Sequence, residues 1–111
     1  MTLSASRKGD IAELFVAQYF MKEGFDVFRN LGCDGPVDLI IHHRETDTIT
    51  KLDIKSIQSV SYLANGEERI FKDKCGLRSD GTWLILYVHA DASLRLPDGL
   101  WESLEGKHTY E

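Results

Sequence analysis

The stretch PVDLIIHHRETDTITKLDIKS, residues 36–56, decides the fold of this chain. Near its start, residues 37–41 form an almost continuous apolar run, which is typical of a buried strand. Residues 49–57 are rich in β-branched side chains and favour a second strand. The polar segment between them, residues 44–47, is short, so the stretch predicts a β-hairpin.

Three charged residues stand inside these predicted strands. Asp53 and Lys55 are two positions apart, so their side chains share one face of their strand. Leu52 and Ile54 take the opposite face and can pack in the core. Asp38 belongs to the neighbouring strand, and same-face side chains of antiparallel neighbours lie about 5 Å apart. We therefore expect Asp38 and Asp53 to be able to bind one ion.

A long helix is predicted upstream of the hairpin, at residues 6–22. Apolar residues recur there at helical spacing, and Gly24 stands where a helix commonly ends. Glu13 interrupts the apolar pattern of this helix. Its neighbours one turn away, Gly9 and Ala17, are small enough to let this side of the helix approach the sheet. We expect the Glu13 carboxylate to point at the strands.

The rest of the chain adds further strands and a second helix. The expected elements are a strand at 25–29, two short strands at 62–63 and 69–71 around the turn Asn65-Gly66, a buried strand at 83–88, an edge strand at 94–96 and a helix at 98–104. This order predicts an α+β, α/β/α-like fold, with a mixed sheet of four to five strands flanked by helices.

The three acidic residues favour a magnesium site. If Glu13, Asp38 and Asp53 converged with no cation between them, they would raise one another's pKa. Mg²⁺, or Mn²⁺ as its substitute, prefers carboxylate oxygens, waters and a backbone carbonyl such as that of Ile54. Lys55 would then lie beside a metal-bound water. Its ammonium group can orient or help deprotonate that water, or stabilise charge on a phosphate.

Taken singly, these residues have simpler explanations. An Asp-x-Lys pair occurs by chance on many solvated strand faces. Asp38 can be an ordinary residue at the start of a strand, and Glu13 can be a surface position on an amphipathic helix. The combination of a helix acid with acids on both arms of a hairpin is what indicates a site.

The composition fits one ordinary globular domain. The 111 residues are 42% hydrophobic and 28% charged, a balance typical of domains that form a core without disulfides. Cys33 and Cys75 are too few for a disulfide framework or a zinc site. No stretch approaches the roughly 20 apolar residues of a membrane span, and no secretion signal is evident. We therefore expect a soluble, cytoplasmic protein.

The net charge argues mildly against a broad nucleic-acid-binding surface, because the formal value is −5. Any contact with DNA must therefore come from local basic patches and from metal ions. Solvated surface charge is the alternative interpretation for each such patch. The candidate contacts are Arg7 and Lys8 at the predicted helix start, Arg29 before the loop that leads into the hairpin, and Lys72 and Lys74 in a basic run with Arg78.

Four short motifs carry a family resemblance: GDIAE at residues 9–13, GFDVFR at 24–29, PVDLI at 36–40 and DIKS at 53–56. Together they resemble the PD-(D/E)XK nuclease superfamily, most of all archaeal-type Holliday junction resolvases and related small phage- and intron-associated endonucleases. The resemblance covers about half of the chain. A valine separates the motif proline from the aspartate, and the loop at 32–35 is acidic where resolvases often have basic or serine residues.

The resemblance implies a restriction-endonuclease-like core over residues 1–111, magnesium-dependent hydrolysis of DNA, and frequent homodimers. By motif, Glu13 is similar to the helix acid of the family, Asp38 to the motif aspartate, Asp53 to the D/E position and Lys55 to the lysine.

Three functions are therefore kept open. The first is a Mg²⁺-dependent endodeoxyribonuclease that acts on Holliday junctions or other branched DNA in recombination, where a twofold dimer can pair two active sites. The second is a site-specific homing or restriction-type endonuclease on the same core. The third belongs to another class: a non-catalytic nucleic-acid-binding protein with this fold.

Overall fold

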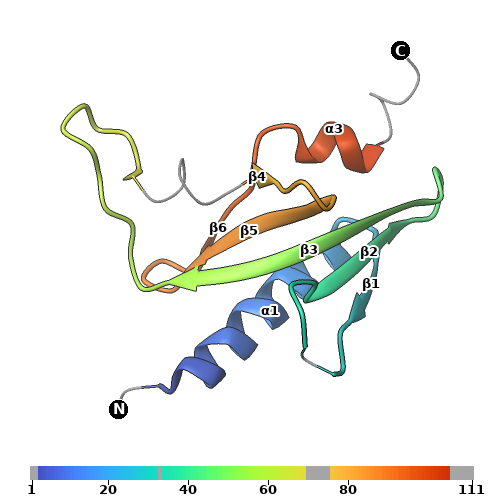
Figure 1. The fold of residues 1–111 in the computed structure, drawn as a ribbon, viewed down its shortest axis with the longest axis horizontal. Helices are drawn as coiled ribbons and strands as arrows, with labels where there is room; N and C mark the ends of the chain where they lie inside the picture. Colours follow the sequence, from blue (N-terminus) through green and yellow to red (C-terminus); the bar gives the residue numbers. More distant parts are fainter. Residues whose placement is uncertain (1–2, 33, 70–75, 106–111) are drawn as a thin grey trace.

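The structure, a computed structural model, describes residues 3–32, 34–69 and 76–105. Its described elements are the six strands of one mixed sheet and two helices (Figure 1). In chain order they are α1 (Ala5–Lys22), β1 (Asp26–Arg29), β2 (Leu39–His43), β3 (Thr48–Ile57), β4 (Gly76–Leu77), β5 (Thr82–Val88), β6 (Ser93–Arg95) and α3 (Leu100–Glu105). Within these described ranges, no helix is both long and apolar enough to cross a membrane.

The sheet joins an antiparallel meander to a parallel strand. β1, β2 and β3 pair antiparallel, with Leu39 opposite Leu52, so the hairpin predicted for residues 36–56 is confirmed. β3 then pairs parallel with β5, with Asp53 opposite Leu84. A parallel pair needs a long crossover, which residues 58–81 provide. β4 and β6 both pair antiparallel with β5.

The long helix predicted near the N-terminus is confirmed. The Ser4 hydroxyl caps it by accepting a hydrogen bond from the Arg7 N–H at 3.1 Å. Gly24 follows its end with a φ of 95°, a conformation that favours glycine. The buried residues of α1 recur at helical spacing and face the sheet: Ala12, Val16 and Phe20.

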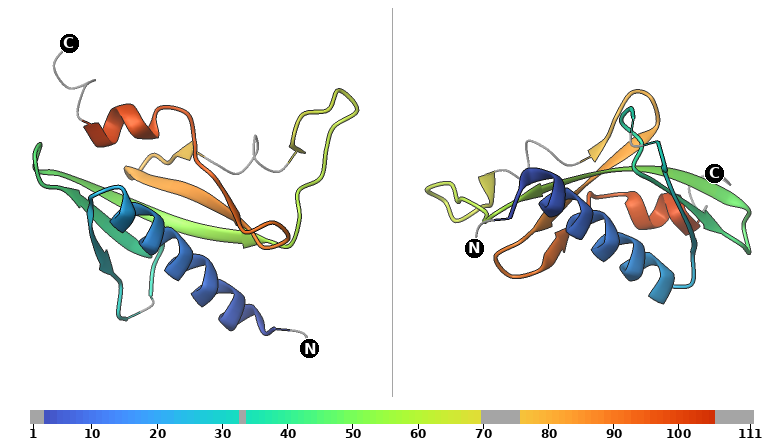
Figure 2. Two further views of the ribbon diagram at one scale, coloured as in Figure 1. Left: turned by 180° about the vertical axis from the view of Figure 1, so that it is seen from behind. Right: turned by 90° about the horizontal axis from the view of Figure 1, so that it is seen from below.

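Both described helices cover the same face of the sheet (Figure 2). Trp101 of α3 lies beside Phe20 of α1, with ring centroids 6.0 Å apart. The strand residues packed in this core alternate along their strands: Leu39, Ile41, Leu52, Ile54, Trp83, Ile85 and Tyr87. Alternation therefore places Asp53 and Lys55 on the other face. The α+β fold with a mixed sheet is confirmed, and its helices flank one face in the described part of the chain.

The structure departs from the sequence prediction at several edges. β2 begins at Leu39 rather than residue 37, because the Asp38 side chain accepts the Ile54 N–H that a continuing strand would have used. β4 was not predicted. Around Asn65-Gly66, a single bridge between Tyr62 and Glu68 replaces the first expected short strand, and most of the second, at 69–71, lies outside the described residues.

Candidate functional site

The candidate site lies where β2 stops pairing with β3. Asp38 Oδ2 accepts a hydrogen bond from the Ile54 N–H at 2.7 Å. The Asp38 N–H donates to the Leu52 carbonyl at 2.8 Å, so its backbone stays beside β3. The N–H and C=O of one strand residue point to the same edge of the strand. The Ile54 carbonyl therefore faces the edge at which the Asp38 carboxylate lies.

Asp53 adds a second carboxylate, and it is almost fully buried. Asp53 as a whole is 3% exposed to solvent. Its Oδ2 accepts a hydrogen bond from Arg78 Nη1 at 2.5 Å. Its Oδ1 lies 3.9 Å from Lys55 Nζ, and the Lys55 side chain is 61% exposed. A buried charge needs such partners, because an unpaired one costs several kcal/mol.

Arg78 is the residue of this site that sequence reasoning missed. The sequence grouped it with Lys72 and Lys74, which lie outside the described residues. A turn holds its backbone: the Arg78 N–H donates to Thr82 O at 2.9 Å, and the Gly81 N–H donates to Arg78 O at 3.0 Å. Arg78 and Asp53 are 25 positions apart, so no local pattern could have linked them.

Glu13 of α1 approaches the same edge from the helix side. Its Oε1 lies 3.4 Å from Arg29 Nε, and Asp10 Oδ1 lies 3.4 Å from Arg29 Nη2. Arg29, a candidate DNA contact, is thus paired with two carboxylates of α1. Arg7 and Lys8 lie in the first turns of α1, whose N-terminal end extends past the sheet (Figure 1).

Asp38 shows that the carboxylates are close enough to act on one another. Its pKa is raised to about 6, first by burial and then by a hydrogen bond with Asp53 and the negative charges of Glu13 and Asp53. The Ile54 N–H opposes this shift by stabilising the ionised form. The structure therefore places Glu13, Asp38, Asp53 and Lys55 near one another, where β2 begins beside β3.

The chemistry of this donor set fits Mg²⁺. Three carboxylates and the Ile54 carbonyl are hard oxygen ligands. Burial is the main cause of the raised pKa of Asp38, and the negative charges of Glu13 and Asp53, which add to it, are charges that a divalent cation would neutralise. As they stand, no three acidic, histidine or cysteine side chains of the described ranges are grouped closely enough to hold an ion. Arg78 contacts Asp53 and Arg29 contacts Glu13, so both acids already have protein partners.

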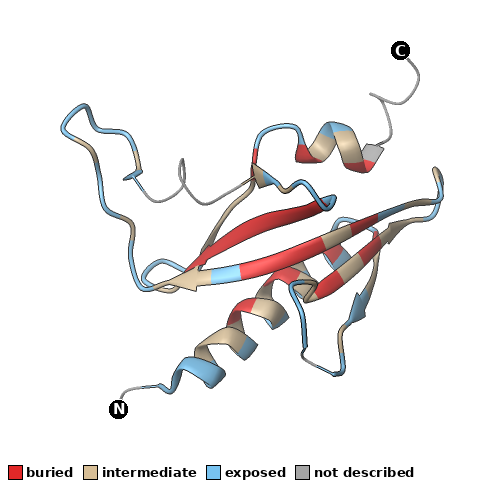
Figure 3. Ribbon diagram, viewed as in Figure 1, coloured by how far each residue is buried: buried red, intermediate tan, exposed pale blue. Residues whose placement is uncertain are grey.

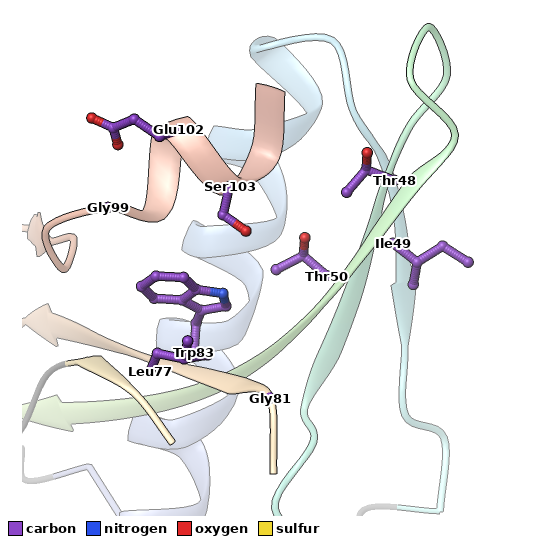
Figure 4. A pocket seen from close by; sticks show the side chains of 9 residues that line it. All are labelled: Thr48, Ile49, Thr50, Leu77, Gly81, Trp83, Gly99, Glu102 and Ser103. Carbon is purple, nitrogen blue, oxygen red and sulfur yellow. The ribbon is translucent and has the colours of Figure 1, made fainter. Parts of the chain in front are cut away.

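Two pockets adjoin this edge. One, of about 350 Å³, is lined by Asp38 together with the basic residues Arg29 and Lys51. The other, of about 200 Å³, is lined by Glu13 and Arg29. A third pocket of about 480 Å³ lies between α3 and the strands, with Trp83 in its wall (Figure 4). None of the four candidate catalytic residues lines this third pocket.

Comparison with known proteins gives one informative similarity. No protein-family model matches the sequence, and no curated protein matches it. Among solved structures, the bacterial homing endonuclease I-Ssp6803I is similar, with a TM-score of 0.60 and 19% sequence identity over 98% of this chain and 75% of that one. At this identity the similarity shows a shared fold.

Proposed function

We propose that this chain is a metal-dependent DNA endonuclease of the PD-(D/E)XK type that hydrolyses phosphodiester bonds. One observation carries the proposal: acids from α1 and β3 lie near enough to Asp38, just before β2, to contribute, after burial, to the rise of its pKa to about 6. Lys55 stands on the same strand as one of these acids. The fold shared with a homing endonuclease supports the same class.

Each residue of the site has a role in this proposal. Glu13, Asp38, Asp53 and the Ile54 carbonyl would hold Mg²⁺, with Mn²⁺ as a substitute. When bound, the ion supplies positive charge to the phosphate and lowers the pKa of a coordinated water. Lys55 would orient that water or donate to a phosphate oxygen. Its exposed ammonium group can reach a substrate without rearrangement of the strand.

Two substrate classes remain as candidates within this proposal. The structural neighbour is a homing endonuclease, so a duplex cut at a defined sequence is favoured over a Holliday junction or other branched DNA. Either substrate suits a homodimer, in which twofold symmetry pairs two sites on two strands. Arg7, Lys8, Lys72 and Lys74 are the proposed backbone contacts. Arg29 would serve only if phosphate displaced the α1 carboxylates.

The test is cleavage of end-labelled DNA by wild type and Asp38→Asn, in Mg²⁺, Mn²⁺ or EDTA. The substrates are a four-way junction, a flap, single strands and a duplex library of randomised sequence. Asp47→Asn is the matched control, because Asp47 is an exposed acid at the other end of the hairpin and its φ of 55° also suits asparagine.

We expect metal-dependent cutting by wild type and Asp47→Asn and none by Asp38→Asn. Cutting of the library at one sequence identifies a site-specific enzyme, whereas cutting of the junction alone identifies a resolvase. If wild type binds DNA and cuts no substrate with either metal, the non-catalytic class replaces the proposal.

A further inference from the structure

Both oxygens of the buried Asp53 carboxylate face cations of the protein itself. Arg78 Nη1 lies 2.5 Å from Oδ2, and Lys55 Nζ lies 3.9 Å from Oδ1. The Asp53 side chain is 4% exposed, so little water shares it. A further cation at this carboxylate would meet the positive charge of Arg78 at short range, where burial strengthens repulsion.

Of the two cations, Arg78 is the tighter partner. Its hydrogen bond is short and charge-assisted, whereas the distance to Lys55 is typical of a loose ion pair. The Lys55 side chain is 61% exposed against 38% for Arg78. An ion entering the site must therefore compete mainly with Arg78.

Hydrogen bonds fix the turn that carries Arg78, while its side chain is 38% exposed. Asp80 Oδ1 accepts a hydrogen bond from the Thr82 N–H at 2.9 Å. Lys51 Nζ, from β3, donates to the Asp80 carbonyl at 3.0 Å. These contacts hold the backbone beside the site. The long, partly exposed Arg78 side chain can leave Asp53 by rotation about its own bonds, with no change in the sheet.

We propose that Arg78 is the resident counter-ion of Asp53, and that a divalent cation binds by displacing its guanidinium group from Oδ2. Metal loading of this site is then an exchange of one cation for another. The inference rests on the proposed function, since it takes Asp53 as a metal ligand. It adds a residue that none of the four sequence motifs contains, and it predicts that metal affinity is held below what the carboxylates alone would give.

The test measures Mn²⁺ binding without DNA, by calorimetry and by the electron paramagnetic resonance signal of free Mn²⁺. Arg78→Gln keeps a hydrogen-bond donor and removes the charge. Arg44→Gln is the matched control, because Arg44 forms a similar ion pair with Asp26 beyond the other end of β2. We expect Arg78→Gln to bind Mn²⁺ about fivefold more tightly than wild type, a ratio typical of losing one partly exposed ion pair, and Arg44→Gln to match wild type.

Equal or weaker binding by Arg78→Gln would overturn this inference and leave the proposed function standing, because metal still binds. Absence of Mn²⁺ binding in wild type and both variants would overturn both. If Arg78→Gln does not fold, side-chain ¹⁵N spectra of wild type decide instead. One arginine signal, assigned by its loss in Arg78→Lys, must shift when Mg²⁺ is added; an unchanged signal rejects the exchange.

Discussion

The two ends of the β2–β3 hairpin hold charge in opposite ways. At the turn end, the Arg44 guanidinium donates three hydrogen bonds of 2.7–3.0 Å to the Asp26 carboxylate. His42 of β2 lies 2.7 Å from Asp47 and 3.5 Å from Asp26. At the site end, Asp38 meets Asp53 and the charge of Glu13. Between them runs a band of buried strand residues (Figure 3).

The pKa values of the acids at the two ends shift in opposite directions. The Arg44 hydrogen bond lowers the pKa of Asp26, whereas burial and neighbouring acids raise that of Asp38 to about 6. A pair that exists only to stabilise the fold resembles the turn end, with cation and anion matched. At the site end, Glu13 and Asp53 have cationic partners, whereas burial and the neighbouring acids disfavour ionisation of Asp38. An acid in such surroundings costs stability when it is ionised, which is consistent with the proposed ligand-binding role of this end.

The largest expected effect comes from neutralising one acid at each end. Asp53→Asn should lower the proposed cleavage rate by roughly a thousandfold, because it removes a proposed metal ligand and leaves Arg78 without its partner. Asp26→Asn should cut at close to the wild-type rate. Single-turnover cleavage with Mg²⁺ measures both. Equal losses in the two variants would show that the ends do not differ in function.

The middle of the hairpin should carry the largest effect on folding. Leu52 is fully buried opposite Leu39, so Leu52→Ala should lower the free energy of unfolding by about 3 kcal/mol. Ile49→Ala is the control, because Ile49 lies on the same strand and is 65% exposed. Urea unfolding followed by circular dichroism compares them. A small loss of unfolding free energy for Leu52→Ala would mean that the Leu39–Leu52 pair contributes little to the stability of the hairpin.

The acids Asp38 and Asp26, one from each end, should give pH dependences of opposite sign. The folded-state pKa of Asp38, about 6, exceeds its ordinary value of 3.8, so the folded state binds the proton more tightly. Stability in EDTA should therefore fall as pH rises from about 4 to 6, by about 1 kcal/mol after allowance for solvent screening. Asp26, with its lowered pKa, contributes stability that is lost as pH falls through its folded-state pKa.

Urea unfolding at a series of pH values in EDTA separates these contributions. Asp38→Asn should remove the decline between pH 4 and 6. It should leave the loss of stability at lower pH, to which Asp26, Glu68 and Asp80 contribute through their lowered pKa values. Saturating Mg²⁺ should flatten the same decline in wild type. A decline that survives in Asp38→Asn would assign it to another group.

The smallest effect is expected for the Arg44 pair at the turn end. Arg44→Gln should lower stability slightly, and that loss should shrink at high salt, because exposed ion pairs are screened. Its cleavage rate should equal that of wild type. Thermal unfolding at low and high NaCl provides the measurement. A loss of activity would extend the functional site to the turn.

Sequence patterns predicted what depends on neighbours along the chain. The alternation around Leu52 and Ile54 predicted the buried face of β3, and the short polar segment predicted the hairpin that brings Asp38 near Asp53. The spacing of apolar residues predicted α1 and placed Glu13 on it. These features follow from period and turn length alone.

What the patterns missed depends on contacts between distant segments. The two residues of β4 form a strand only because β5 lies beside them. In the sequence, Arg78 is one charge of a basic run. Its contact with Asp53 depends on the crossover, which brings together residues that are 25 positions apart. The sequence also did not predict that α3 covers the same face of the sheet as α1. The pattern of apolar residues in α3 does not say which face they cover.

The parallel pairing of β3 with β5 has a consequence for how the molecule folds. The meander of β1, β2 and β3 closes through shorter connections than residues 58–81, so it can form before β5 docks. We therefore expect Asp38 and Asp53 to come together before the crossover brings Arg78 to them. We expect refolding to speed up in mild acid, where protonation relieves the early repulsion before the guanidinium arrives.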